Sequence, residues 1–233
     1  MDINQFGLRQ SSFEIRYPKA FLLWDRSGSV WADAFTRWPE LKLITAQPNV
    51  MTFKLGSDIE LAILLDRAHV ISATTKHDPD LFGKLCAFII DSAIEVGVEK
   101  YSRVGYRLTF VKRYQTIDEA TDAFASIDLV KFPKGKNFGI DGRIKNPDCS
   151  FRLEDENLGC RCQLAVQTKS TNIELPLGES EEVKFEASER HDLIFDCDYY
   201  TTADVAVGQL KTDVWLRQAE QVMRRDAKVI LGG

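Results

Sequence analysis

Three alternating segments followed by a helix are indicated twice along this chain. In the first half the segments span residues 49–55, 58–65 and 69–75, and in the second half they span 149–154, 160–168 and 191–200. A helix is indicated after each set, over residues 78–96 and 204–231. Alternation of apolar and polar residues is typical of half-buried strands. We therefore predict an α+β fold of two β-β-β-α-like halves, with antiparallel sheets and two long helices packed on the sheet.

The first of these helices has a capping pattern at its start. Asp78 precedes Pro79, and an acidic N-cap followed by proline is a common beginning of a helix. Outside the two repeated units, strands are expected over 11–17 and 101–113, and short helices over 29–38 and 117–125, the second capped by Thr116.

A segment rich in turn-forming residues separates the halves. Residues 131–147 contain three glycines and two prolines and have little periodicity, which is typical of a connection. We therefore divide the chain into an N-terminal half over 1–130, a connection over 131–148 and a C-terminal half over 149–233. The two halves are compatible with one composite domain.

Composition and charge narrow the class of protein. The chain has 30 Lys and Arg against 35 Asp and Glu, a net charge of −5, which argues against general, charge-driven binding of nucleic acid. No run of 18 apolar residues is present, and the N-terminus lacks a basic segment followed by an apolar one. We expect a soluble, cytoplasmic protein that does not bind membranes. Residues 145–200 carry 13 acidic and 6 basic residues, an asymmetry that could attract a basic partner.

The five cysteines are interpreted as free thiols, as expected in a reducing compartment. Cys160 and Cys162 are one residue apart in an alternating stretch, so they should share a strand face. The four later cysteines, with His191, are conceivable zinc ligands, but their spacing contains no C-x-x-C knuckle. The sequence therefore predicts no metal and no cofactor.

Two strands place charged side chains at alternate positions. Arg103 and Arg107 share one face of the strand 101–113, and Asp196 and Asp198 share one face of the strand 191–200. One interpretation is a ligand site, in which the aspartates bind a divalent cation or the arginines bind a phosphate or carboxylate. The favoured interpretation is that the arginines pair with the aspartates across the sheet.

Two further segments have a functional and a structural interpretation. Lys131, Lys134 and Lys136 alternate with aromatic residues and could contact nucleic acid, although a solvated connection is favoured. Trp24, Trp31 and Trp38 recur every seven residues; Trp31 and Trp38 should share a helix face, with Trp24 outside that helix. Tryptophans so spaced are usually core residues, but exposed ones would be anchors for a partner. The final Gly-Gly is expected to end the last helix.

Two segments resemble an uncharacterised, sporadically distributed family of bacterial proteins. Tyr101-Ser102-Arg103-Val104-Gly105-Tyr106-Arg107 resembles the family's central "RIGLRY" strand, and Leu193-Ile194-Phe195-Asp196-Cys197-Asp198-Tyr199 resembles its late D-x-D strand before a long C-terminal helix. The helix containing Trp215 fits that place. The chain departs from the family where Met223-Arg224-Arg225-Asp226 stands in place of an H-x-x-x-x-x-F ending. The resemblance implies a fold and a bacterial host, and it implies no reaction.

Motifs of the common catalytic classes are missing from the sequence. It contains no G-x-S-x-G, G-x-G-x-x-G or Walker A pattern. We therefore assign no catalytic residue and expect that the protein is not an enzyme. The leading hypothesis is a non-enzymatic protein-interaction module of a bacterial complex. The alternatives are an enzyme or small-ligand binder using the Arg/Asp faces, and a nucleic-acid binder using the lysine-rich loop.

Overall fold

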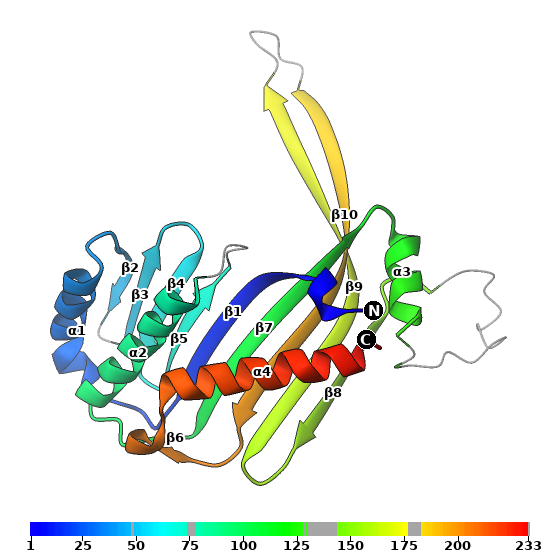
Figure 1. Cartoon of the computed structure of the whole chain (residues 1–233). Coiled ribbons are helices and arrows are strands. Elements are labelled where there is room, and N and C mark those ends of the chain that lie inside the picture. Colours follow the sequence, from blue (N-terminus) through cyan, green and yellow to red (C-terminus); the bar gives the residue numbers. More distant parts are fainter. Residues whose placement is uncertain (48, 74–77, 128, 130–143, 177–182, 233) are drawn as a thin grey trace.

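The structure is a computed structural model that describes residues 1–47, 49–73, 78–127, 129, 144–176 and 183–232. Within these residues the chain is an α+β protein built on a nine-stranded antiparallel sheet, with helices packed on one face (Figure 1). The fold class predicted from the alternating segments is therefore confirmed.

The elements follow one another in the order that the periodicities indicate, with some additions. The strands are β1 (Gly7–Arg16), β2 (Lys42–Gln47), β3 (Val50–Leu55), β4 (Ile59–Leu64), β5 (Arg67–Ser72), β6 (Lys100–Tyr101), β7 (Arg103–Tyr114), β8 (Asp148–Glu154), β9 (Leu158–Pro176), β10 (Val183–Thr201) and β11 (Val205–Ala206). The helices are α1 (Leu23–Arg37), α2 (Pro79–Glu95), α3 (Ile117–Ala125) and α4 (Thr212–Ile230), with single 3-10 turns at Ile3–Gln5 and Val207–Gln209.

The strand order shows how the two repeated units combine. The sheet runs β2-β3-β4-β5-β1-β7-β10-β9-β8, so β1 and β7 are neighbours at its centre. The meander β3-β4-β5 lies on the β1 side and the meander β8-β9-β10 lies on the β7 side. Each meander is followed along the chain by a long helix, α2 or α4 (Figure 1). The division at 131–148 stays a prediction, because residues 130–143 lie outside the described part.

One face of the sheet forms the core with the helices. Tyr106 of β7 packs against Phe82 of α2 with the two rings tilted, and Phe13 of β1 packs edge-on against Trp215 of α4. The next residues along β7 point to the other face, where Arg103 and Arg107 lie. The alternation in the sequence therefore sets which side chains the helices cover, and it leaves the charged positions on the helix-free face.

Two helices begin at the capping residues that the sequence predicts. The Asp78 carboxylate accepts hydrogen bonds from the backbone N–H groups of Asp80 and Leu81, and the Thr116 hydroxyl accepts one from Glu119 N–H. Both predicted N-caps are confirmed.

Several strand and helix limits differ from the prediction because tertiary packing decides them. Helix α1 begins at Leu23 rather than at residue 29, because its buried stripe Leu23, Val30 and Ala34 continues past Gly28. Helix α4 begins at Thr212, since β11 pairs with β6 in the preceding residues. The edge strand β2 was not predicted. β9 and β10 each have 19 residues and extend as a two-stranded arm beyond the other strands (Figure 1).

Candidate functional site

Helix α1 and the residues before it carry exposed aromatic side chains. Phe21, Trp24 and Trp31 are 59%, 54% and 44% exposed. Phe21 lies edge-on to Trp24 with ring centroids 5.9 Å apart, and Trp31 lies edge-on to Phe35 at 5.8 Å. Because α1 begins at Leu23, Trp24 belongs to the helix and lies seven residues, or two turns, from Trp31.

Trp38 is placed differently from the other two tryptophans. It ends α1 and packs edge-on against Phe88 of α2, with centroids 5.4 Å apart. It is a partly buried residue at the margin of the core. The prediction that Trp24 lies outside the helix is therefore wrong. Trp24 and Trp31 share the exposed side of α1, whereas Trp38 follows the last residue of the helix and packs against α2.

The Arg103 guanidinium is held by three groups on the helix-free face. Its Nη2 donates to both carboxylate oxygens of Asp198, at 2.9 and 2.8 Å, and its Nη1 donates to Glu14 at 3.1 Å. The guanidinium also lies 4.7 Å from the centroid of the Tyr200 ring. Burial raises the pKa of Asp198, and the Arg103 charge opposes this effect.

Arg107 and Asp196 form the second pair. Arg107 Nε lies 2.8 and 2.9 Å from the two Asp196 oxygens, and the Thr109 hydroxyl donates to the same carboxylate at 2.7 Å. The hydrogen bond with Asp196 raises the pKa of Arg107. Pairing of the arginines with the aspartates across the sheet, the favoured interpretation of the sequence, is confirmed. A polar hollow of about 160 Å³ lies beside these pairs.

A second ion cluster surrounds Asp192 farther along β10. The Asp192 side chain is fully buried on the sheet. Arg190 Nε is 2.8 Å from its carboxylate, and Arg113 and Arg9 approach it to 3.9 and 4.0 Å. Since these arginines come from β10, β7 and β1, one carboxylate connects three neighbouring strands. Arg190 lies two residues from Asp192 on β10, whereas Arg9 and Arg113 reach Asp192 only because β1, β7 and β10 are neighbours, so the sequence did not reveal the whole cluster.

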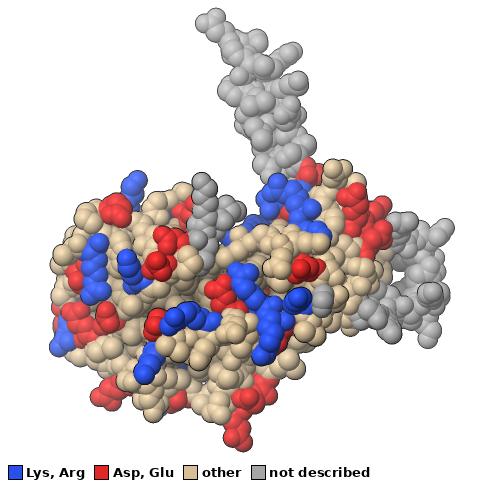
Figure 2. Space-filling view, viewed as in Figure 1, with Lys and Arg blue, Asp and Glu red and all other residues tan. Residues whose placement is uncertain are grey.

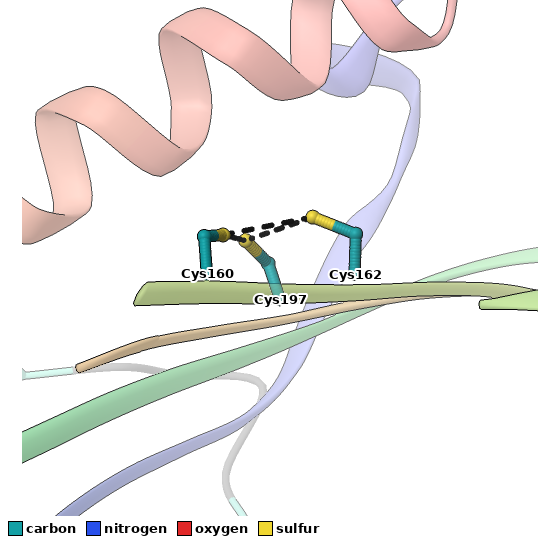
Figure 3. Close-up of side chains that lie close together, drawn as sticks. All are labelled: Cys160, Cys162 and Cys197. Atoms are coloured by element: carbon teal, nitrogen blue, oxygen red, sulfur yellow. Dashed lines mark hydrogen bonds between the residues drawn. The ribbon is translucent and has the colours of Figure 1, made fainter. Parts of the chain in front are cut away.

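Three thiols gather on the helix-covered face. Cys160 and Cys162 of β9 and Cys197 of β10 have Sγ–Sγ distances of 3.4, 3.6 and 3.7 Å (Figure 3). Hydrogen bonds from Cys162 and Cys197 lower the pKa of Cys160, and the same bonds together with burial raise the pKa of the other two thiols. Cys160 and Cys162 share a strand face, as predicted.

The other conceivable zinc ligands do not join these thiols. Cys149 of β8 lies opposite Leu164, and the His191 Nδ1 atom is 3.0 Å from the Thr168 hydroxyl. Among the described residues, a group of three metal-ligating side chains is found at Cys160, Cys162 and Cys197 alone. A signal for this group was present in the sequence, since Cys197 occupies an inward position of an alternating strand.

A hollow lies between the beginnings of α2 and α4. Its volume is about 470 Å³, and its apolar floor includes Phe82, Tyr106 and Leu216. Charged groups of both signs, Lys84, Arg217 and Glu220 among them, line its margin. The predicted lysine loop of Lys131, Lys134 and Lys136 lies outside the residues that the structure describes.

Comparison with known proteins adds no family to these observations. The chain matches no family model, and a search of curated proteins found no match. The resemblance to the bacterial family with a RIGLRY-like strand therefore stays a prediction. Among the described residues, no helix has both the length and the apolar character needed to cross a membrane.

Proposed function

We propose that this protein is a non-enzymatic interaction module that binds another protein through an aromatic stripe on α1. The stripe consists of Phe21, Trp24, Gly28, Trp31 and Phe35, at intervals of three and four residues along one side of the helix. The observation that carries the proposal is the exposure of Trp24 and Trp31 together on this side. Large aromatic side chains in the centre of an interface supply much of the binding free energy.

The exposed area supports recognition rather than chance exposure. Taking about 200–250 Å² for each aromatic side chain, the exposed fractions of Phe21, Trp24 and Trp31 amount to roughly 350 Å². Patches of about 300–600 Å² on single chains are often functional. Leu22 and Ile94 are also exposed, and they extend the apolar surface at the ends of α1 and α2.

The shape of the stripe favours insertion of a side chain from the partner. Gly28 lies on the helix between Trp24 and Trp31, and a methyl group placed there would meet no atom within 4 Å. Gly28 is itself exposed, so the helix backbone between the two tryptophans is accessible. In our proposal an apolar side chain of the partner packs at Gly28, between the two rings.

Charges around the stripe indicate the chemistry of the partner. Helix α1 carries Asp25, Arg26, Asp33 and Arg37, and it contacts Asp91 and Glu95 of α2. The region around the stripe thus contains four carboxylates and two guanidinium groups, so it is acidic. Arg37 is already paired with Asp33 and Asp91. The helix-covered face has acidic and basic groups interspersed elsewhere (Figure 2). We expect a partner segment with apolar anchors and basic flanks.

The Arg/Asp faces and the lysine loop carry less support. Arg103 and Arg107 already bond to carboxylates, so a ligand would have to displace those pairs. A catalytic role lacks support, because among the described residues we identify no group that combines an acid, a base and a nucleophile.

The test compares proteins captured from the native host by tagged wild type and by Trp24→Ser/Trp31→Ser. A matched control, Leu153→Ser/Val229→Ser, removes two exposed apolar side chains on other elements. A partner captured by wild type and control but lost from the tryptophan variant is then purified, and its binding is titrated directly. We expect the double substitution to weaken binding by at least about 30-fold, which corresponds to about 2 kcal/mol.

Two results would contradict the proposal. One is a purified partner that binds wild type and the tryptophan variant with equal affinity. The other is light scattering that shows a wild-type dimer and a monomeric tryptophan variant, since a second copy of this chain would then occupy the stripe.

A further inference from the structure

We propose that Cys160, Cys162 and Cys197 form a three-thiolate site for one thiophilic metal ion with a filled d shell, such as Zn²⁺ or Cu⁺. Their strand pairing brings the thiols together. Cys162 and Cys197 are directly opposite each other on β9 and β10, and Cys160 is two residues from Cys162 on the same face. All three Sγ atoms project from the sheet toward α4 (Figure 3).

The spacing of the sulfur atoms suits a metal ion. With a Zn–S distance of about 2.3 Å and tetrahedral geometry, two sulfur ligands lie about 3.8 Å apart. The three Sγ–Sγ distances here are 3.4, 3.6 and 3.7 Å. An ion could therefore join the three sulfurs with side-chain shifts of a few tenths of an ångström, and the strands need not move.

The donor atoms select the class of ion. Thiolates prefer soft ions such as Cu⁺ and Zn²⁺, whereas Mg²⁺ and Ca²⁺ prefer oxygen ligands. Within the described part of the chain, no His, Asp or Glu completes the group as a fourth ligand. Three-coordinate Cu⁺ would need no further ligand, and Zn²⁺ would take a water molecule in the fourth position.

The surroundings of the thiols allow entry of an ion. Cys162 and Cys197 are buried, whereas Cys160 is only partly buried. The ion can thus reach Cys160 from solvent, and each thiol releases its proton to solvent as its sulfur binds the ion. Once bound, the ion connects β9 to β10 beneath α4. Because it binds the folded chain, it should stabilise that chain in proportion to the logarithm of its concentration.

The experiment uses the full chain, reduced with a phosphine and freed of metal. Zn²⁺ is titrated against a chromophoric chelator, and Cu⁺ is titrated without oxygen against a Cu⁺ chelator. We expect one ion of at least one kind per chain. Cys160→Ser is the first variant, because its thiol is the least buried of the three, and circular dichroism checks its folding. Cys149→Ser and Cys86→Ser are matched controls outside the group.

We expect Cys160→Ser to lower the affinity for the ion by at least about tenfold. Loss of a residue that only supports a metal ligand already lowers affinity by about that factor, so loss of a ligand should lower it at least as much. Two further measurements need no variant. Co²⁺ bound to thiolates gives a near-ultraviolet charge-transfer band. Bound Zn²⁺ should protect Cys160 from alkylation, and peptide mass spectrometry identifies the cysteines that are alkylated. Absence of stoichiometric binding by both ions would overturn the proposal. Equally tight binding by Cys160→Ser together with unprotected Cys160 in wild type would also overturn it.

Discussion

The Arg103 guanidinium lies over Gly105 and bonds to both oxygens of Asp198 on the neighbouring strand. In the strand register Asp198 is opposite Arg107, so Arg103 reaches it diagonally from β7 to β10. Glu14 of β1 accepts a hydrogen bond from the same guanidinium at 3.1 Å. Three adjacent strands thus meet at one side chain. The missing side chain of Gly105 provides the space in which the guanidinium lies.

This relationship predicts the effect of Gly105→Ala. The added methyl group would fall on the Arg103 guanidinium and displace it from Asp198 and Glu14. Because Asp198 is largely buried, its unpaired carboxylate would be poorly solvated. We expect the free energy of unfolding to fall by about 1–3 kcal/mol in urea denaturation.

Gly83→Ala is the matched control for that substitution. Gly83 lies inside α2, and a methyl group there meets nothing within 4 Å. Alanine is the better helix former, so this variant should be more stable by about 0.5–1 kcal/mol. Equal effects of the two substitutions would show that the Arg103 position does not depend on Gly105.

Asp192→Asn should destabilise the protein by about 2–3 kcal/mol. The substitution keeps the shape of the side chain but leaves Arg9, Arg113 and Arg190 around a neutral, buried amide. Asp213→Asn is the control, since Asp213 is 75% exposed and pairs only with Arg217 along α4 in the described structure. Its effect should stay within about 0.5 kcal/mol. Chemical denaturation of both variants at one salt concentration measures the difference.

Asp78→Ala should destabilise the protein by about 1 kcal/mol, because the backbone N–H groups of Asp80 and Leu81 lose their acceptor. Asp78→Asn keeps an acceptor oxygen and should recover most of the loss. Thermal unfolding of the three proteins, followed by circular dichroism, gives the comparison. If asparagine and alanine were equally destabilising, the capping hydrogen bonds would not be the cause.

His69 should make stability depend on pH. Burial lowers the pKa of His69 below its ordinary value of 6.5, although Glu14 and Glu60 oppose the effect. The unfolded chain therefore binds the proton more readily than the folded chain. The contribution of neutral His69 to the stability of the folded chain is fully present above pH 6.5 and is lost as the pH falls below that value. His69→Gln should show a smaller loss of stability between pH 7 and pH 5.5 in urea denaturation; an unchanged slope would assign the dependence to other groups.

Local patterns were sufficient for much of the secondary structure. Alternation predicted the strand positions of β3, β4 and β8, and the N-caps Asp78 and Thr116 marked the starts of α2 and α3. These features depend on residues within one turn or one strand of each other, so neighbouring residues determine them. The same alternation correctly assigned Arg103 and Arg107 to one face of β7.

Features that depend on strand pairing were not predictable in the same way. The length of β9 and β10 was underestimated, because their acidic, proline-containing ends lack the pattern of a strand. Each strand is nevertheless paired with the other along its full length, and this pairing supplies the hydrogen bonds that extend the hairpin. The start of α1 was missed because Gly28 interrupts its local helix propensity, whereas packing of Leu23 stabilises the first turns.

The sequence alone determined which side chains share a strand face, because that follows from the two-residue period of a single strand. It placed Cys160 with Cys162 and Asp196 with Asp198. Only the tertiary structure decided that Cys197 lies opposite Cys162 and that Arg9 reaches Asp192. Those contacts join residues far apart in the chain, and they depend on the register of whole strands. A shift of one residue would turn every such side chain to the opposite face.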